Sequence, residues 1–151
     1  MLTNREFREL LSAFKSFDVR FLVVGGYAVM RYAEPRFTKD LDLWVGTDTE
    51  NASRTFNALK SFGAPLTGLT AQDFTDTKSF YQMGVPPFRV DIMFFLTGLE
   101  FESAWKNRNE TTLGGVSVPF ISLDDLMVAK KALGRPSDLL DLANLERAKK
   151  R

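Results

Sequence analysis

Two aspartates separated by a single residue, Asp40 and Asp42, are the first residues whose type and spacing suggest chemistry. They alternate with the apolar Leu41 and Leu43, which is the period-two pattern of a β-strand, so both carboxylates are expected on one face. Two like charges this close repel each other unless a cation lies between them, and aspartate oxygens are ligands of magnesium and manganese. The alternative is a pair of solvated acids on the outer face of an amphipathic strand.

A pair of glycines, Gly25 and Gly26, follows a short apolar run at 21–24 that predicts a buried strand. Glycines between this strand and the helix predicted from 27 to 33 would let the backbone approach a ligand closely, and free N–H groups at a helix start favour phosphate. The alternative is a tight turn with no ligand. The segment is neither a G-x-G-x-x-G dinucleotide fingerprint nor a Walker A loop.

A third acid, Asp91, lies on the polar face of a strand predicted at 88–94, whose other face is apolar. A lone acid in this position is usually only exposed to solvent. Together with Asp40 and Asp42 it would complete three carboxylates on sheet strands. Three are enough for a two-metal site, because magnesium keeps several water and phosphate ligands.

The composition narrows the chemistry further. The 151 residues include no histidine and no cysteine, which excludes disulfides, Cys/His zinc sites, cysteine nucleophiles and histidine general bases. With 20 Lys and Arg against 19 Asp and Glu, the net charge of +1 gives the whole protein no steering toward nucleic acid. No segment is apolar enough to span a membrane and the charged segment 1–7 does not resemble a signal peptide, so we expect a cytoplasmic protein.

Helices and strands alternate along the chain in the order needed to position these residues. The order predicts one α/β (α+β) domain over 1–151, a small mixed β-sheet flanked by helices, with residues 122–151 forming a C-terminal helical pair. Helices are predicted at 3–17, 27–33, 49–62, 122–133 and 136–149, a single turn at 101–105, and strands at 21–24, 40–45, 79–83, 88–94, 110–113 and 116–118.

Three segments in this order resemble the DNA polymerase β-like nucleotidyltransferase superfamily: VGGYA at 24–28, RFTKDLDL at 36–43 and VDI at 90–92. The signature of that superfamily is a hydrophobic residue with Gly-Gly or Gly-Ser, then Asp-x-Asp or Asp-x-Glu on the next strand, then a third Asp on a later strand. The segment 122–145 is similar to the tail of small bacterial members, including abortive-infection toxin nucleotidyltransferases. The matching tail residues are Ser122 to Leu126, Lys130, Gly134 to Pro136, Asp138 and Asp141.

The resemblance implies a role for each matching residue of the first three segments. Gly25 and Gly26 would bind the triphosphate of an NTP. Asp40 and Asp42 would hold Mg²⁺ or Mn²⁺, and Asp91 would be the third metal ligand and would help to deprotonate the acceptor.

Four basic residues are candidates for phosphate binding. Lys130 matches a lysine that lies near the nucleotide phosphates in related toxins, and a plain surface lysine is the alternative. Arg36, Lys39 and Arg135 could neutralise phosphate. For Arg36 and Lys39, which are next to the acids in sequence, a plain salt bridge is the alternative.

The hypothesis that follows is a metal-dependent nucleotidyltransferase that transfers an NMP from ATP or another NTP to an acceptor hydroxyl and releases pyrophosphate. The acceptor could be tRNA, a protein or a small molecule, and a cognate antitoxin or a second copy of the chain could be a partner. The alternative is a non-catalytic binding or regulatory module with the same fold, such as one half of a toxin–antitoxin pair. A third reading is an unrelated mixed domain whose acids form only a solvated face.

Overall fold

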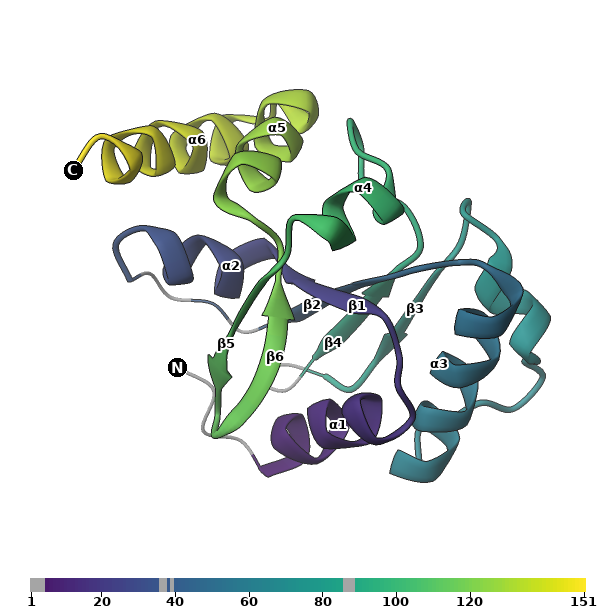
Figure 1. Cartoon of the computed structure of the whole chain (residues 1–151). Coiled ribbons are helices and arrows are strands. Elements are labelled where there is room, and N and C mark those ends of the chain that lie inside the picture. The colour runs from purple at the N-terminus through teal and green to yellow at the C-terminus, as the bar shows by residue number, and fades with distance from the viewer. Residues whose placement is uncertain (1–4, 36–37, 39, 86–88) are drawn as a thin grey trace.

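The computed structural model describes residues 5–35, 38, 40–85 and 89–151. Within these residues six strands form one sheet that has helices on both sides (Figure 1). This confirms the expected α/β class and the small mixed sheet. The helices are α1 (Arg5–Ser16), α2 (Gly25–Tyr32), α3 (Thr49–Phe62), α4 (Phe101–Lys106), α5 (Leu123–Leu133) and α6 (Pro136–Lys149), with a 3₁₀ turn η1 (Ala71–Thr75). The strands are β1 (Phe21–Val24), β2 (Leu41–Val45), β3 (Phe80–Met83), β4 (Val90–Met93), β5 (Asn109–Leu113) and β6 (Val116–Phe120).

The strands lie in the order β3-β4-β2-β1-β6-β5. β1 is antiparallel to β2 and parallel to β6, β2 is parallel to β4, and the outer pairs β3–β4 and β5–β6 are antiparallel. All four residues of β1 are buried, as expected for a central strand whose two faces are both covered. In Figure 1, α1 lies below the sheet and α3 at its lower right, whereas α2, α5 and α6 lie toward the top of the view.

The predicted helix signals near the C-terminus are present in the structure. The Ser122 Oγ accepts a hydrogen bond of 3.1 Å from the Asp125 N–H at the start of α5. Gly134 ends this helix in the left-handed conformation, and Pro136 opens α6. α5 and α6 therefore form in the two places where the sequence predicts the last two helices. The single-domain organisation over 1–151 stays a prediction.

The start of α2 differs from the expectation. α2 begins at Gly25 and not at residue 27, so the glycine pair belongs to the first turn of the helix. Trp44, which shares the Asp42 face of β2, is only 2 % exposed, because α4 covers it. The Trp44 and Phe101 rings meet edge to face with their centroids 5.2 Å apart. The polar face of β2 is therefore confined to the end of the strand that carries Asp42.

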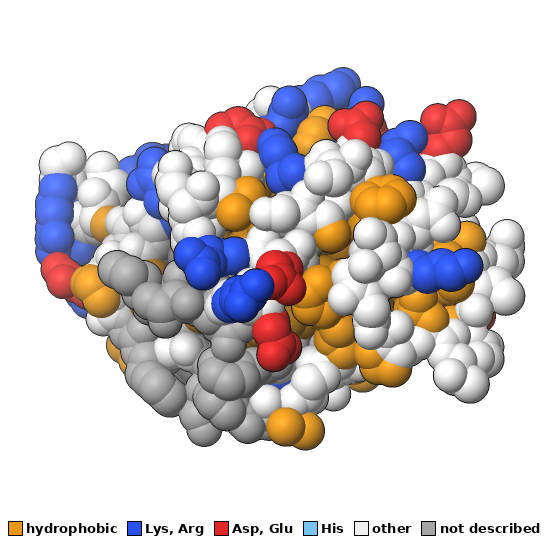
Figure 2. All heavy atoms as spheres, turned by 90° about the horizontal axis from the view of Figure 1, so that it is seen from below, with side chains coloured by type: hydrophobic (Ala, Val, Ile, Leu, Met, Phe, Trp, Pro, Cys, Tyr) orange, Lys and Arg blue, Asp and Glu red, His pale blue; other side chains and the backbone are white. Residues whose placement is uncertain are grey.

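The face of the molecule seen from below carries Lys, Arg, Asp and Glu side chains close together, with hydrophobic side chains gathered between them (Figure 2). This mixture of signs agrees with the net charge of +1. In the described part of the chain, no helix has both the length and the apolar character needed to cross a membrane.

Candidate active site

Asp42 and Asp91 lie side by side on neighbouring strands. The parallel register of β2 and β4 pairs Asp42 with Asp91, so both carboxylates project from the same face of the sheet. The register also pairs Val24 of β1 with Asp42, and Gln82 of β3 with Asp91. A row of four side chains thus crosses four strands, with the two acids in the middle.

The guanidinium group of Arg89 contacts both Asp40 and Asp91. Its Nη2 lies 3.1 Å from Asp91 Oδ2 and 3.1 Å from Asp40 Oδ2. The second oxygen of Asp91, Oδ1, accepts a hydrogen bond of 2.8 Å from Gln82 Nε2. Asp91 is therefore held through both oxygens, and Asp40, which precedes β2, is connected to it through one guanidinium group.

The carboxyl group of Asp42 is in an environment that disfavours its negative charge. Its pKa is raised from 3.8 to about 7, first because it is buried and then because of the charge of Asp91 and a hydrogen bond to it. Asp40 adds to the increase, and Arg89 opposes it. A cation placed between these acids would favour the ionised form of Asp42, since metal ligands bind as deprotonated groups.

Gly25 brings the main chain directly against Asp42. Its φ is +66°, and a Cβ built on this residue would stand 2.0 Å from Asp42 Oδ2. Both the conformation and the close approach require glycine. At the start of α2, the N-cap residue Val24 supplies no side-chain hydrogen bond to the first N–H groups of the helix. The glycine pair at the start of α2 therefore lies beside a carboxylate, at a helix terminus that no side chain caps.

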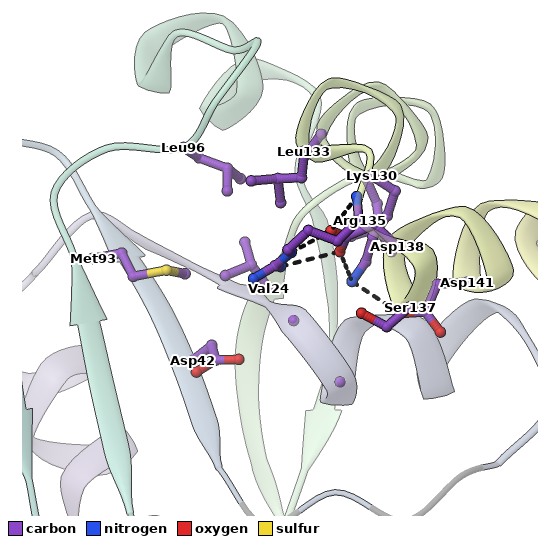
Figure 3. Close-up of a pocket in the computed structure, with 14 residues that line it drawn as sticks. Val24, Asp42, Met93, Leu96, Lys130, Leu133, Arg135, Ser137, Asp138 and Asp141 are labelled. Atoms are coloured by element: carbon purple, nitrogen blue, oxygen red, sulfur yellow. Dashed lines mark hydrogen bonds and ion pairs between the residues drawn. The ribbon is translucent and has the colours of Figure 1, made fainter.

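A cavity of about 230 Å³ adjoins this end of the sheet. One wall includes Gly25, Gly26 and Asp42, and the opposite wall, formed by α5, α6 and the turn between them, includes Lys130 and Arg135. Figure 3 shows the side chains of α5 and α6 gathered on one side of the cavity and Asp42 and Met93 on the other. The cavity thus lies between the predicted phosphate-binding glycines and the predicted phosphate-binding cations.

Lys130 is buried, with only 8 % of its surface exposed, so it is not a plain surface lysine. Its Nζ lies 3.3 Å from Asp138 Oδ1 and 3.0 Å from Asp141 Oδ2. Arg135 contacts both oxygens of Asp138, with its Nε 2.5 Å from Oδ2 and its Nη2 3.2 Å from Oδ1. The hydrogen bonding with Arg135, and then Lys130, lowers the pKa of Asp138 against the effect of its burial. The two cations of the cavity are therefore paired with two buried carboxylates.

The structure brings most of the predicted site residues together. Gly25, Gly26, Asp42 and Lys130 line one cavity, and Asp91 stands next to Asp42. Arg36 and Lys39 lie outside the described residues.

Two residues of the site escaped the sequence analysis, Arg89 and Gln82. Arg89 lies two positions before Asp91, so the same strand alternation could have placed it beside that acid. The position of Gln82 next to Asp91 follows only from the pairing of β3 with β4, and no sequence motif indicates it.

The fit of these residues to a metal ion is partial. Their oxygen ligands suit Mg²⁺ or Mn²⁺. A bound cation would also offset the repulsion between Asp42 and the neighbouring carboxylates. Across the described ranges, however, no group of three or more acidic side chains is gathered as a ready metal site. Asp42 and Asp91 are adjacent, whereas Asp40 is connected to Asp91 through the guanidinium group of Arg89.

Comparisons by sequence give no match, either to a family model or to a curated protein. Comparisons by structure find proteins with a similar fold. A Thermotoga maritima protein, TM1012, described provisionally as a nucleotidyltransferase, matches with a TM-score of 0.62 at 20% identity, over 97% of this chain and 92% of that one. The lincosamide antibiotic adenylyltransferase LnuA, in its lincomycin-bound structure, matches with a TM-score of 0.56 at 15% identity, over 97% of this chain and 98% of that one. The chain therefore has the fold of these proteins over almost its whole length.

Proposed function

We propose that the chain is a metal-dependent nucleotidyltransferase, which transfers an NMP from an NTP to an acceptor hydroxyl and releases pyrophosphate. The observation that carries this proposal is the placement of Asp42: it faces Asp91 on one side and the backbone of Gly25 on the other, at the wall of a cavity. Carboxylates for metal and backbone N–H groups for phosphate are thus adjacent, as nucleotidyl transfer requires. The likeness in fold to LnuA and TM1012 supports the same reaction class.

Asp42 and Asp91, joined by Asp40, would hold Mg²⁺ or Mn²⁺ in this reaction. When bound, the metal would neutralise phosphate charge and make the acceptor hydroxyl easier to deprotonate. The protein's own contribution would be to fix these carboxylates in a row, an arrangement supported by the register of β2 with β4 and by the hydrogen bond from Gln82 to Asp91.

The triphosphate would lie in the cavity, along Gly25 and Gly26. Lys130 would contribute less than a free cation because Asp138 and Asp141 already neutralise it, and Arg135 is the more accessible of the two, with 66 % of its side chain exposed. Arg36 and Lys39 are proposed as further phosphate ligands from the sequence alone. The cations of the cavity are already paired with carboxylates. A bound triphosphate would therefore need the positive charge of a metal ion to balance its own negative charge.

The acceptor would approach from the side of Asp91 and Gln82. Transfer proceeds with the attacking and leaving oxygens roughly in line. If the leaving pyrophosphate lies over Gly25, the attacking hydroxyl must come from the opposite end of the row. Asp91, at that end, would help to deprotonate it.

The acceptor is proposed to be a small molecule, a protein or the end of a tRNA. A net charge of +1 gives little support to a long nucleic-acid footprint, whereas a small acceptor needs only the site itself. LnuA is a lincosamide adenylyltransferase, so small hydroxylated molecules are the first class to test. A cognate antitoxin or a second copy of the chain, either of which could complete the acceptor site, remains part of this proposal.

The competing proposal is a non-catalytic binding module with the same fold. The observation that favours it is the engagement of Asp40 and Asp91 by Arg89, which leaves the carboxylates short of a gathered metal site. In this reading the cavity would bind a nucleotide or a regulatory ligand without turning it over.

Transfer of label from each α-³²P-NTP, with Mg²⁺ or Mn²⁺, separates the two proposals. The acceptors offered are lincomycin, a set of aminoglycosides, total tRNA and the protein itself. Labelled acceptor and released pyrophosphate with the wild type, both lost in Asp42→Asn and Asp91→Asn variants that stay folded, are the expected result. Metal-dependent NTP binding without transfer to any acceptor would favour the binding module.

A further inference from the structure

Arg89 occupies the position in which a cation would join two of the proposed metal ligands. One nitrogen, Nη2, is 3.1 Å from an oxygen of Asp40 and 3.1 Å from an oxygen of Asp91. Asp40 directly precedes β2 and Asp91 lies near the start of the neighbouring β4, so a single positive group holds together two carboxylates that otherwise repel each other.

The main chain keeps Arg89 beside the site. The N–H of Leu41 donates a hydrogen bond of 3.0 Å to the carbonyl oxygen of Arg89, just before β2 and β4 begin to pair at Leu41 and Val90. The main chain of Arg89 is therefore tied to that of Leu41 at the start of β2. Any change in the position of the charge must come from rotation of the side chain.

The side chain of Arg89 is held incompletely. It is 34 % exposed, so there is solvent into which it can turn. Its Nε is buried and makes no hydrogen bond, although burial of a donor without a partner is unfavourable. Leaving this position would therefore release one unsatisfied group as it breaks the two carboxylate contacts.

We propose that Arg89 is an internal counter-ion, which stabilises Asp40 and Asp91 when no metal is bound and must leave them when a divalent cation binds. This inference rests on the metal site of the proposed function. Arg89 and the divalent cation compete for the same two carboxylates. Arg89 therefore stabilises the metal-free protein and lowers its affinity for the metal. The guanidinium group, once released, remains next to the site where the acceptor would arrive.

The test compares Arg89→Met with Arg54→Met. Arg54 is a matched control: its side chain is 32 % exposed, it pairs with one acid, Glu50, and its Nε is also buried without a partner. Both variants and the wild type are freed of metal with EDTA, and their thermal unfolding is measured. Mn²⁺ is then titrated into each by calorimetry, without nucleotide, so the readout does not depend on activity.

Arg89→Met is expected to lower the unfolding temperature of the metal-free protein and to tighten Mn²⁺ binding by roughly tenfold or more, because a positive charge next to the cation is gone. Arg54→Met is expected to leave Mn²⁺ affinity unchanged. Arg89→Gln, which keeps a polar side chain, is expected to tighten binding in the same direction and serves if the methionine variant does not fold.

Equal Mn²⁺ affinity in the wild type and the Arg89 variants would overturn the inference and leave the proposed metal site intact. Weaker binding by the variants would also overturn it, because Arg89 would then help to hold the ligands in place for the metal. Absence of Mn²⁺ binding in all proteins would also overturn the inference, because Arg89 would then have no cation to compete with. The proposed function is tested separately, by Mg²⁺-dependent binding of NTP, in which the phosphates supply further metal ligands.

Discussion

Gly25 and Asp42 are in contact across two strands: a Cβ on Gly25 would lie 2.0 Å from Asp42 Oδ2. The glycine follows β1 directly and the aspartate lies on β2, opposite Val24 in the register. The two motifs that the sequence shows separately, a glycine pair and an acid pair, therefore form one structural unit. A side chain at position 25 would displace the carboxylate that stands at the centre of the site.

Gly25→Ala is expected to impair the site more than the fold. A residue with a Cβ in the left-handed region costs on the order of 1–2 kcal/mol, and the clash with Asp42 adds to this. Gly68→Ala is the matched control, because Gly68 also has a positive φ, +80°, but its Cβ would meet nothing within 4 Å. Urea unfolding of both variants and calorimetric titration with Mg-ATP measure the two effects. Wild-type nucleotide binding by a folded Gly25→Ala protein would contradict this account.

The stability of the metal-free protein is expected to depend on pH through Asp42. Between its ordinary pKa of 3.8 and its folded pKa of about 7, the folded protein keeps a proton that the unfolded chain has lost. The free energy of unfolding therefore falls as pH rises through this range and becomes constant above it. The contribution of Asp42 to this fall is at most on the order of 4 kcal/mol.

Asp42→Asn should remove this pH dependence. Urea unfolding in EDTA between pH 4.5 and 8.5 gives the difference in stability between the wild type and the variant. Subtraction cancels the other titrating groups, such as Asp138, whose pKa is lowered. A difference that stays constant with pH would show that Asp42 titrates as an ordinary carboxylate.

Lys130→Met is expected to destabilise the protein by about 3–5 kcal/mol, the usual cost of removing one partner from a buried ion pair. The change leaves Asp138 and Asp141 buried without the ammonium group that contacts both. Lys131→Met, on the exposed neighbouring residue, should stay within about 0.5 kcal/mol of the wild type. If the two variants unfold at the same urea concentration, Lys130 does not hold α5 and α6 together.

Much of this fold could be predicted from local sequence patterns. The alternation of Leu41, Asp42 and Leu43 marks β2, and the capping pattern at Ser122 marks the start of α5, because in both cases neighbouring residues determine the structure. The fold class follows from the order of such elements. The pairing of Asp42 with Asp91 does not, since it depends on which strands become neighbours in the sheet.

The contacts of individual site residues were harder to predict for the same reason. Lys130 looks like an ordinary helix lysine until α6 brings Asp138 and Asp141 against it. Arg89 gains its position from the closeness of the starts of β2 and β4, which lie about fifty residues apart in sequence. Long-range contacts of this kind leave no local pattern.

Calorimetric titration of the four NTPs, with and without Mg²⁺, into the wild type and Asp42→Asn tests the central claim most directly. We expect at least one NTP to bind the wild type only when Mg²⁺ is present, and the variant, folded by circular dichroism, to have lost this binding. Metal-independent binding that survives in Asp42→Asn, or no binding by the wild type under any condition, would contradict a nucleotidyltransferase site built on Asp42.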